Sequence, residues 1–438
     1  MFICVFSNYM AAELLSLFAD ITIMVDFEGR FQMNMKYDGG IYWLLDCRFD
    51  YFLPLFIQEY NIGEEDIIFV QSFHSKTRHK YKTIYLLPDK RKSVYLMEPD
   101  DVNYLFSKSL NLGRKNLVIS FSGAGLPQDE NLESLTAVGL TAKLCNDKWW
   151  QYKFFRKLSV MTPDTYYCND FMEAESLFPK LVDKYRKVII KKACLSGGYR
   201  MEVLSSAYEL NQYRQKLDQE SLEQEILLSE YIPHQQSFAS MGIIRKDGGV
   251  FFINAITEQV LYREVAYEGL VFPAFLDEAY FNEIRDMTIL LGKELGQAGY
   301  YGFYNVDFLL GDKGLYVVEV NARLGFGSIL AACLYGNQFF KVLQGRCTDE
   351  VVYGGKRLVI GKVKGREGRS YGNLESFSGI SDWFREGDGY FETFYCGDGE
   401  SELFEYGSYI GVFGEFFEMG ESRERVLHKF WERCIEWY

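Results

Sequence analysis

The sequence predicts a mixed α/β protein built from more than one domain. Its 438 residues correspond to two to four folding units at roughly 100–200 residues per domain. The first 145 residues alternate short β-rich runs with helical ones, which is typical of βαβ units. After residue 234, apolar runs are joined by glycine-rich turns such as KDGG at 246–249, which is typical of antiparallel hairpins. A single small module is therefore excluded.

Composition and charge narrow the classes of function. The chain is 48% hydrophobic and 25% charged, as in an average globular protein, so disorder and low complexity are excluded. Its 47 basic and 61 acidic residues give a net charge of −14, which argues against nucleic acid or an anionic membrane as partner. Its nine cysteines form no CxxC pair and it has four histidines, so a zinc site is not expected. The start lacks a basic region before an apolar one, which favours the cytoplasm.

Residues 1–145 are predicted to form an N-terminal α/β domain. No GxGxxG follows the first strand, so the dinucleotide-binding fingerprint is absent. Seven basic residues lie in the stretch 76–92, for which a solvated hairpin is favoured over an anion site. The expected strands cover 1–6, 21–27, 66–72, 83–87, 93–97 and 116–122. One expected helix begins near Ser7 or Asn8, and two others cover 101–110 and 131–138.

The character of the sequence changes at residue 146, where we place a domain boundary. NDKWWQYKFFRKL at 146–158 predicts an aromatic-rich helix, and the Thr-Pro that follows favours an extended exit. Helices are then expected at 171–185 and 207–217, and strands at 187–193, 201–206 and 225–232. These elements predict one unit over 146–233.

From residue 234 onward the pattern is β-rich. Hairpins are expected within 237–262 and 300–323, with a long helix at 278–297 between them and a helix at 328–343 after them. The remaining residues contain short strands with glycine-rich turns and end in a helix at 421–438. We therefore expect a second unit over 234–345 and a small β-rich cap over 346–438.

The hairpin at 300–323 carries two acids that are predicted to meet. Strand alternation puts Asp307 on one face of GFYNVDFLL, and Glu319 shares a face of LYVVEVN with Asn321. If residues 312–314 form a three-residue loop, Asp307 lies opposite Glu319. Facing carboxylates repel, so their placement is explained if a hard divalent cation, with Mg²⁺ preferred, binds between them and Asn321 adds an oxygen ligand. A solvated hairpin face with ordinary charges explains the same residues equally well.

Two further segments suggest contacts with a nucleotide. The strand at 187–193 delivers Lys191 and is followed by Gly197 and Gly198, whose amides would fold over phosphates. The strand at 225–232 offers backbone groups to an adenine edge and Glu230 to ribose hydroxyls. Taken singly, each is better explained by ordinary structure, namely a common strand-to-glycine turn and a plain core strand.

Taken in order, these segments resemble the ATP-grasp superfamily of ligases over about residues 146–345. The matching run is NDK with Lys148, KVIIKKACLSGG with Lys191, the strand LLSEYI, and DFLLGDKGLYVVEVNARLGFGS. Aspartate at position 307 is as in the D-alanine ligase and dipeptide ligase branches. The resemblance implies an ATP-grasp fold with residues 1–145 as its pre-ATP-grasp domain, and ATP with Mg²⁺ or Mn²⁺ as cofactors.

The resemblance also implies roles for individual residues. It implies that the phosphates are bound by Lys148, Lys191, Gly197 and Gly198, and that adenine and ribose are bound by Ser229, Glu230 and Ile232. It implies that the metal is bound by Asp307, Glu319 and Asn321, and that catalysis depends on Arg323 and Lys191. The chain departs from the family pattern at Lys192, where many members have proline, and in NAR in place of the commoner NPR.

The implied function is ATP-dependent carboxylate–amine ligation through an acyl phosphate, with release of ADP and phosphate. Small-molecule carboxylates and amines, such as amino acids or small peptides, are the expected substrates, and a homodimer is compatible with the pattern. We expect lids at 195–200 and 262–273, and substrate contacts from Arg263 or Glu268, although ordinary loop charges also explain these two. The alternatives are an ATP-grasp kinase or carboxylase and a non-catalytic ATP-binding scaffold.

Overall fold

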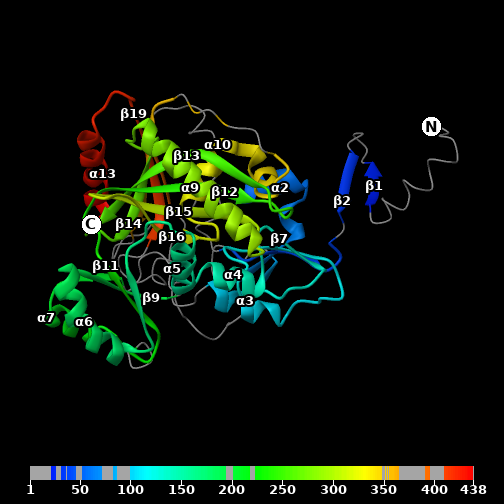
Figure 1. Ribbon diagram of the computed structural model, residues 1–438. Coiled ribbons are helices and arrows are strands. Elements are labelled where there is room, and N and C mark those ends of the chain that lie inside the picture. The colour runs from blue at the N-terminus through cyan, green and yellow to red at the C-terminus, as the bar shows by residue number, and fades with distance from the viewer. Residues whose placement is uncertain are drawn as a thin grey trace.

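The mixed α/β class is confirmed by a computed structural model (Figure 1). The structure describes residues 21–25, 31–35, 37–45, 52–71, 82–85, 99–193, 201–217, 222–347, 351, 353, 355–364, 390–394 and 409–437. Within these residues the strands form four sheets of two, four, five and eight strands. No helix in this part of the chain is long and apolar enough to cross a membrane.

A parallel sheet forms the N-terminal part of the molecule, with the strand order β5-β4-β3-β6-β7. Its order reverses between β3 and β6, and the carboxyl ends of such strands are where open α/β sheets bind ligands. The strands are β3 (Gly40–Trp43), β4 (Ile67–Gln71), β5 (Thr83–Tyr85), β6 (Asn116–Ile119) and β7 (Leu132–Ser134), and the helices of this part are α2 (Leu53–Tyr60), η2 (Glu64–Asp66) and α3 (Pro99–Ser107).

Two expectations for this region are wrong. Residues 131–138 do not form a helix; Leu132 and Ser134 are buried on β7, which pairs in parallel with β6. Completing the sheet edge outweighs the helical spacing of the apolar residues, and the next helix, α4 (Gly139–Cys145), begins only at Gly139 with φ +67°. The strand expected at 21–27 is β1 (Ile21–Val25), which pairs antiparallel with β2 (Phe31–Met35) and not as part of a βαβ unit. The strands expected at 1–6 and 93–97, the helix expected from Ser7 or Asn8, and the basic residues of the stretch 76–92 other than Lys82 lie outside the described residues.

A four-stranded antiparallel sheet follows, with the order β10-β9-β11-β8. Helices α6 and α7 cover one side of it, as Figure 1 shows, and their apolar residues share a core with the strands. The elements are β8 (Thr165–Cys168), α6 (Phe171–Tyr185), β9 (Val188–Lys192), β10 (Glu202–Leu204), α7 (Ala207–Gln215) and β11 (Ile226–Glu230). The expected helices and strands of this region are thus confirmed.

The largest sheet is antiparallel, with the order β16-β15-β12-β13-β14-β17-β19-β18. Its strands are β12 (His234–Ile244), β13 (Val250–Tyr262), β14 (Ala266–Phe272), β15 (Gly302–Gly311), β16 (Gly314–Asn321), β17 (Arg357–Lys364), β18 (Tyr390–Phe394) and β19 (Tyr409–Phe417). Because β14 pairs with β17, the sheet runs across residue 345, and the boundary placed there stays a prediction.

Helices pack on both faces of this large sheet. On one face, α9 (Glu278–Gln297) and α5 (Lys148–Lys157) share a core with Val306, Phe308 and Val320. On the other face a second core includes α10 (Gly327–Tyr335), α11 (Phe339–Leu343) and α13 (Arg423–Trp437). The helix expected at 328–343 is divided by η4 (Gly336–Gln338), where Gly336 has φ +50°.

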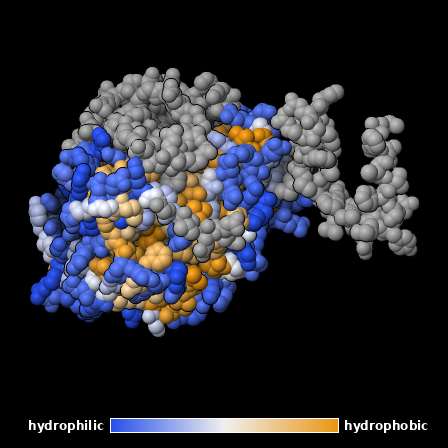
Figure 2. Space-filling view, turned by 90° about the horizontal axis from the view of Figure 1, so that it is seen from above, coloured by the Kyte–Doolittle hydropathy of each residue, from blue (hydrophilic) through white to orange (hydrophobic). Residues whose placement is uncertain are grey.

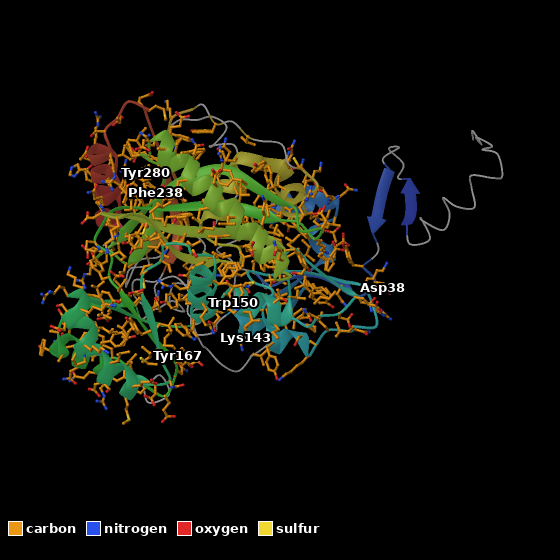
Figure 3. The ribbon with its side chains drawn as sticks, viewed as in Figure 1. Asp38, Lys143, Trp150, Tyr167, Phe238 and Tyr280 are labelled. Atoms are coloured by element: carbon orange, nitrogen blue, oxygen red, sulfur yellow. The ribbon has the colours of Figure 1, made fainter. Side chains whose placement is uncertain are left out.

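One face of the molecule carries both hydrophobic and hydrophilic residues. Seen from above, hydrophobic residues form a band that hydrophilic residues border (Figure 2). Side chains on α5 lie between the large sheet and the four-stranded sheet: Trp150 is placed in the middle of the molecule and Tyr167, on β8, below it (Figure 3). Helix α5 therefore connects the two sheets that carry the candidate site.

Candidate active site

The two acids of the predicted metal hairpin meet as expected. Strands β15 and β16 pair antiparallel, and Asp307 lies opposite Glu319 while Asn305 lies opposite Asn321. Val306 and Val320, between these positions, are fully buried in the core beneath α9. Because side chains alternate along a strand, Asp307, Glu319 and Asn321 face the other side together.

The register that brings the acids together differs from the predicted one. Gly311 pairs with Gly314, so the loop contains two residues and not three. A bulge then makes Val318 the extra residue of β16 and shifts the pairing by one. Without this bulge Asp307 would lie opposite Val318 and Glu319 would point into the core. Bulges beside functional sites commonly re-aim a side chain in this way.

Asp307 is held by two amide donors. Gln259 Nε2 donates to Asp307 Oδ1 and Asn321 Nδ2 donates to Asp307 Oδ2, each at 2.9 Å. Burial, and then the negative charge of Glu319, raise the pKa of Asp307 to about 7 although Arg323 acts in the opposite direction. The carboxylate is therefore poorly compensated at neutral pH by the protein alone.

Glu319 is surrounded by cations. Lys148 Nζ lies 3.0 Å and Arg323 Nη2 4.0 Å from Glu319 Oε1. Burial alone would raise the pKa of Glu319, but Lys148 and Arg323, with Lys191, hold it below its ordinary value. Glu319 is thus ionised, and its position between three cations suits a site for a highly charged ligand.

The two phosphate lysines predicted from sequence are brought together. Lys148 opens α5, where the side chain of Asp147 accepts a hydrogen bond from Trp150 N at 2.7 Å. The backbone N of Lys148 donates to Ala193 O at 3.0 Å, just after β9. Burial first, and then the charge of Lys148, lower the pKa of Lys191 to about 8, while Glu319 raises it. The helix and the strand therefore deliver their lysines to one place.

Arg323 is fixed from two sides and linked to the N-terminal sheet. Its Nη1 donates to Asn146 Oδ1 at 2.6 Å and its Nη2 to Asn321 Oδ1 at 2.5 Å. The guanidinium lies 5.9 Å from the ring centroid of Phe121, whose carbonyl accepts from Leu324 N at 3.0 Å. Phe121 follows β6, so the carboxyl end of the parallel sheet borders the site.

The segment predicted to contact adenine and ribose forms β11 and the residues after it. Its polar side chains bond to the neighbouring residues Thr165 and Asp164. The hydroxyl of Ser229 shares a 2.9 Å hydrogen bond with that of Thr165, and Ser229 is 1% exposed. Glu230 Oε2 accepts from Asp164 N at 3.3 Å. Ile232 is buried, at 5% exposure. Nucleotide contacts from this segment stay a prediction, and the bonds favour backbone groups for the role.

The residues expected to contact the substrate lie on β14 and in the turn before it. Arg263 lies in the exposed turn between β13 and β14 with φ +48°, and its guanidinium is 5.1 Å from the ring of Tyr262. Glu268 is buried on β14. A lid over 262–273 is wrong, because most of it is β14, a strand paired on both sides. Gly197 and Gly198, with the lid expected at 195–200, lie outside the described residues.

Three residues of the site were not singled out from the sequence. Gln259 holds Asp307, Asn146 holds Arg323, and Gln151 on α5 bonds to the backbone of β16. Asn146 belongs to the NDK motif itself, and Gln151 stands one helical turn after Lys148. Gln259 follows Thr257 and Glu258, and Gln151 lies between Lys148 and Lys153, so no signal in the sequence marks either glutamine.

The donor set indicates which metal the site suits. Among the described residues no group of three or more His, Cys, Asp or Glu is arranged to hold a metal. What the hairpin offers is two carboxylates and an amide, all oxygen donors. Hard cations such as Mg²⁺ are held by one or two carboxylates together with substrate phosphates, so the residues present fit Mg²⁺ or Mn²⁺.

Comparison with known proteins identifies the same segment. A family model described as an ATP-grasp domain matches residues 145–327. A [butirosin acyl-carrier protein]–L-glutamate ligase from Niallia circulans is 25% identical over 162 residues, which is 36% of this chain and 38% of that protein. The chain thus matches little more than a third of that relative's length.

Solved structures match across most of the chain. A biotin carboxylase from Campylobacter jejuni, solved with a β,γ-ATP ligand, has a TM-score of 0.62 at 14% identity and covers 91% of each chain. N5-carboxyaminoimidazole synthetase from Staphylococcus aureus has a TM-score of 0.60 at 11% identity, covering 91% of this chain and 98% of its own. At such identities the likeness establishes the fold. The family match shows an ATP-grasp domain at residues 145–327, and the lysines, acids and arginine of the candidate site lie within it.

Proposed function

We propose that the protein is an ATP-dependent carboxylate–amine ligase. The observation that carries the proposal is the cluster in which Asp307, Glu319 and Asn321 face Lys148, Lys191 and Arg323 within an ATP-grasp domain. Two acids that repel one another, placed among three cations, suit a metal-bound polyphosphate and not a folded core.

The metal would be held by Asp307 and Glu319 with Asn321 as a third oxygen donor. When bound, Mg²⁺ neutralises charge on the phosphates and orients them. In the protein alone Lys148 stands 3.0 Å from Glu319, so Lys148 is the group that must shift toward a phosphate as the carboxylate takes a new partner.

The cations have separate tasks. Lys148 and Lys191, from a helix start and a strand end, would hold the phosphates from two directions. Arg323 is already fixed by Asn146 and Asn321, so its guanidinium is preorganised for the phosphoryl group that moves. Preorganisation matters because phosphoryl transfer depends mostly on positioning and charge stabilisation.

The proposed reaction has two steps. A carboxylate oxygen of the donor attacks the γ-phosphorus of ATP, the bond to the β,γ-bridging oxygen breaks, and ADP leaves. The amine nitrogen of the acceptor then attacks the acyl carbon, the bond from that carbon to the phosphate oxygen breaks, and the amine loses a proton. The products are an amide, phosphate and ADP.

The substrate class is supported by the curated relative and not by a pocket in this structure. That relative's name joins L-glutamate to an acyl-carrier protein. We propose an amino acid as one reactant, with a small molecule or a carrier-bound group as the other. The two solved neighbours, a biotin carboxylase and a carboxyaminoimidazole synthetase, are 14% identical or less and bear on the fold alone.

The test is a paired-substrate assay. The full chain is incubated with ATP, Mg²⁺ and pairs drawn from the amino acids, short carboxylic acids and an acyl-carrier protein, and both ADP release and product mass are measured beside Glu319→Gln. We expect ADP release that needs both substrates, and a product whose mass equals the sum of the two substrate masses minus one water. Phosphorylation of a single substrate would replace the proposal with a kinase, carboxylation with bicarbonate would replace it with a carboxylase, and ATP binding without turnover would indicate a scaffold.

A further inference from the structure

A buried amide connects the helix of Lys148 to the strand of the metal acids. Gln151, 1% exposed on α5, donates from Nε2 to Val320 O at 2.6 Å and accepts at Oε1 from Val320 N at 2.9 Å. Its second Nε2 hydrogen is directed to Cys145 O at 2.9 Å. All the strong hydrogen-bonding groups of one side chain are therefore used, two of them on a single residue of β16.

Strand β16 needs such a partner because it is an edge strand. It is first in the order of the eight-stranded sheet and pairs only with β15 among the described strands. The N–H and C=O of Val320 bond to Gln151, and Val320 is fully buried, so water cannot serve as their partner. The amide of Gln151 takes the place of one residue of a neighbouring strand.

The residue that is held this way stands between two proposed metal ligands. Glu319 precedes Val320 and Asn321 follows it. Two hydrogen bonds to the peptide groups of Val320 fix the backbone on both sides, and with it the directions of these side chains. The bulge at Val318 interrupts the pairing with β15 just before them, so the strand has less support there from its other neighbour.

The same helix also sets the position of the cations. Lys148 and Gln151 are three residues apart and thus lie on one side of α5. The Lys148 backbone bonds to Ala193 O at the end of β9, and Asn146 Nδ2 bonds to Ala322 O at 3.1 Å. Residues 146–151 therefore bind the end of the Lys191 strand and the end of β16 at once.

We propose that Gln151 is a positioning residue for the metal site: its side-chain amide locks the backbone of Val320 so that Glu319 and Asn321 are held as ligands at a fixed distance from Lys148. This inference rests on the metal site in the proposed function and adds a residue that touches neither metal nor nucleotide. Partners that orient ligands commonly change metal affinity by 10–100-fold when removed.

The test compares Gln151→Met and Gln151→Glu with the parent and with Thr288→Val. Methionine matches the size of glutamine and removes both bonds to Val320, whereas glutamate retains an acceptor for Val320 N but cannot donate to Val320 O. Thr288 is buried on α9, where its hydroxyl bonds Ser240 on β12 and Ile284 O. Thr288→Val therefore controls for lost stability without touching β16.

Three quantities are measured for each protein: Mn²⁺ affinity with ADP present, by electron paramagnetic resonance; ADP affinity without metal; and hydrogen exchange of the peptide containing Val320. For Gln151→Met we expect Mn²⁺ affinity at least tenfold weaker, exchange at Val320 at least tenfold faster, and metal-free ADP affinity within twofold of the parent. Gln151→Glu should lie between Gln151→Met and the parent. Thr288→Val should lower the melting temperature and leave Mn²⁺ affinity within twofold.

Parent-like Mn²⁺ affinity in both Gln151 variants would overturn the inference while leaving the proposed function intact. An equal loss in Thr288→Val would overturn it too, since the effect would then follow general stability. If the parent itself does not bind Mn²⁺ with ADP, the proposed function fails at its metal site. If Gln151→Met does not fold, Gln151→Glu alone decides the matter by the same measurements.

Discussion

Two acids of the same sheet have opposite surroundings. Glu258, on β13, is 1% exposed, accepts from Arg423 Nε at 2.6 Å and from Gln236 Nε2 at 3.3 Å, and has a cation from the C-terminal helix as its partner. Asp307, on β15, has two neutral amides as its donors and faces a second carboxylate, Glu319. One acid is matched within the fold and the other is left for a ligand to complete.

The difference shows how a buried charge that stabilises the fold can be told from one that serves a ligand. A buried charge that the protein neutralises connects elements; here Glu258 attaches α13 to the large sheet. A buried charge placed beside another of the same sign costs stability and is retained where a ligand uses it.

The largest effect is expected for Glu319→Gln. It removes a metal carboxylate and the ion-pair partner of Lys148, so the rate of ADP release should fall at least about 10³-fold. Steady-state kinetics at saturating ATP and a range of Mg²⁺ concentrations measures it. A fall of less than tenfold would mean that Glu319 is not a ligand.

The matched acid should behave in the opposite way. Glu258→Gln leaves Arg423 without its carboxylate, and we expect a loss of about 2 kcal/mol in the free energy of unfolding with ADP release within threefold of the parent. Thermal unfolding measures the change in stability, and the same kinetic assay measures the rate of ADP release. Unchanged stability would show that the Glu258–Arg423 pair does not attach α13.

Asp307→Asn should stabilise the metal-free protein while abolishing activity. The pKa of Asp307, about 7 in the folded chain, lies above its ordinary value of 3.8. Its contribution to stability is therefore full below the ordinary pKa and is lost as the pH rises from there through 7. Asparagine does not titrate. The melting temperature of Asp307→Asn should therefore exceed that of the parent by a margin that grows between pH 5.5 and pH 8. A margin that shrinks over this range would contradict the assignment.

The smallest effect is expected for Ser229→Ala. The hydroxyl of Ser229 bonds Thr165, so its loss should cost about 1 kcal/mol of stability and leave ADP affinity within twofold. Isothermal titration with ADP, alongside thermal unfolding, checks both values. A tenfold loss of ADP affinity would show instead that the side chain itself contacts the nucleotide.

Much of the fold was predictable because it is local. Helix α6 follows the capping residue Asp170, and α9 follows Asp277, each of which accepts a backbone hydrogen bond in the first turn. Both helices begin and end where the apolar spacing predicts. The β7 segment was mispredicted because its apolar spacing fits a helix, while the free edge of β6 favours a strand.

In the candidate site, too, local features were predictable from the sequence and long-range contacts were not. The facing of Asp307 and Glu319 was predicted from alternation, yet the predicted loop was one residue too long, and only the bulge at Val318 restores the pairing. A bulge has no clear signal in a run such as LYVVEVN. The roles of Gln259 and Gln151 depend on atoms 48 and 169 residues away in the chain, which no spacing along the sequence reveals.

By itself the sequence determined most of the elements, the acid-to-acid spacing and the lysines and arginine that suit phosphate, because these follow from local propensity, alternation and residue chemistry. Only the tertiary structure decided which buried polar and charged groups have a matching partner within the protein and which do not. It set Glu258 against Arg423, Asp307 against Glu319 and Gln151 against the edge of β16. The reason is physical: burial and the sign of the neighbouring charge depend on where distant segments pack, and those two quantities decide whether an acid serves the fold or a ligand.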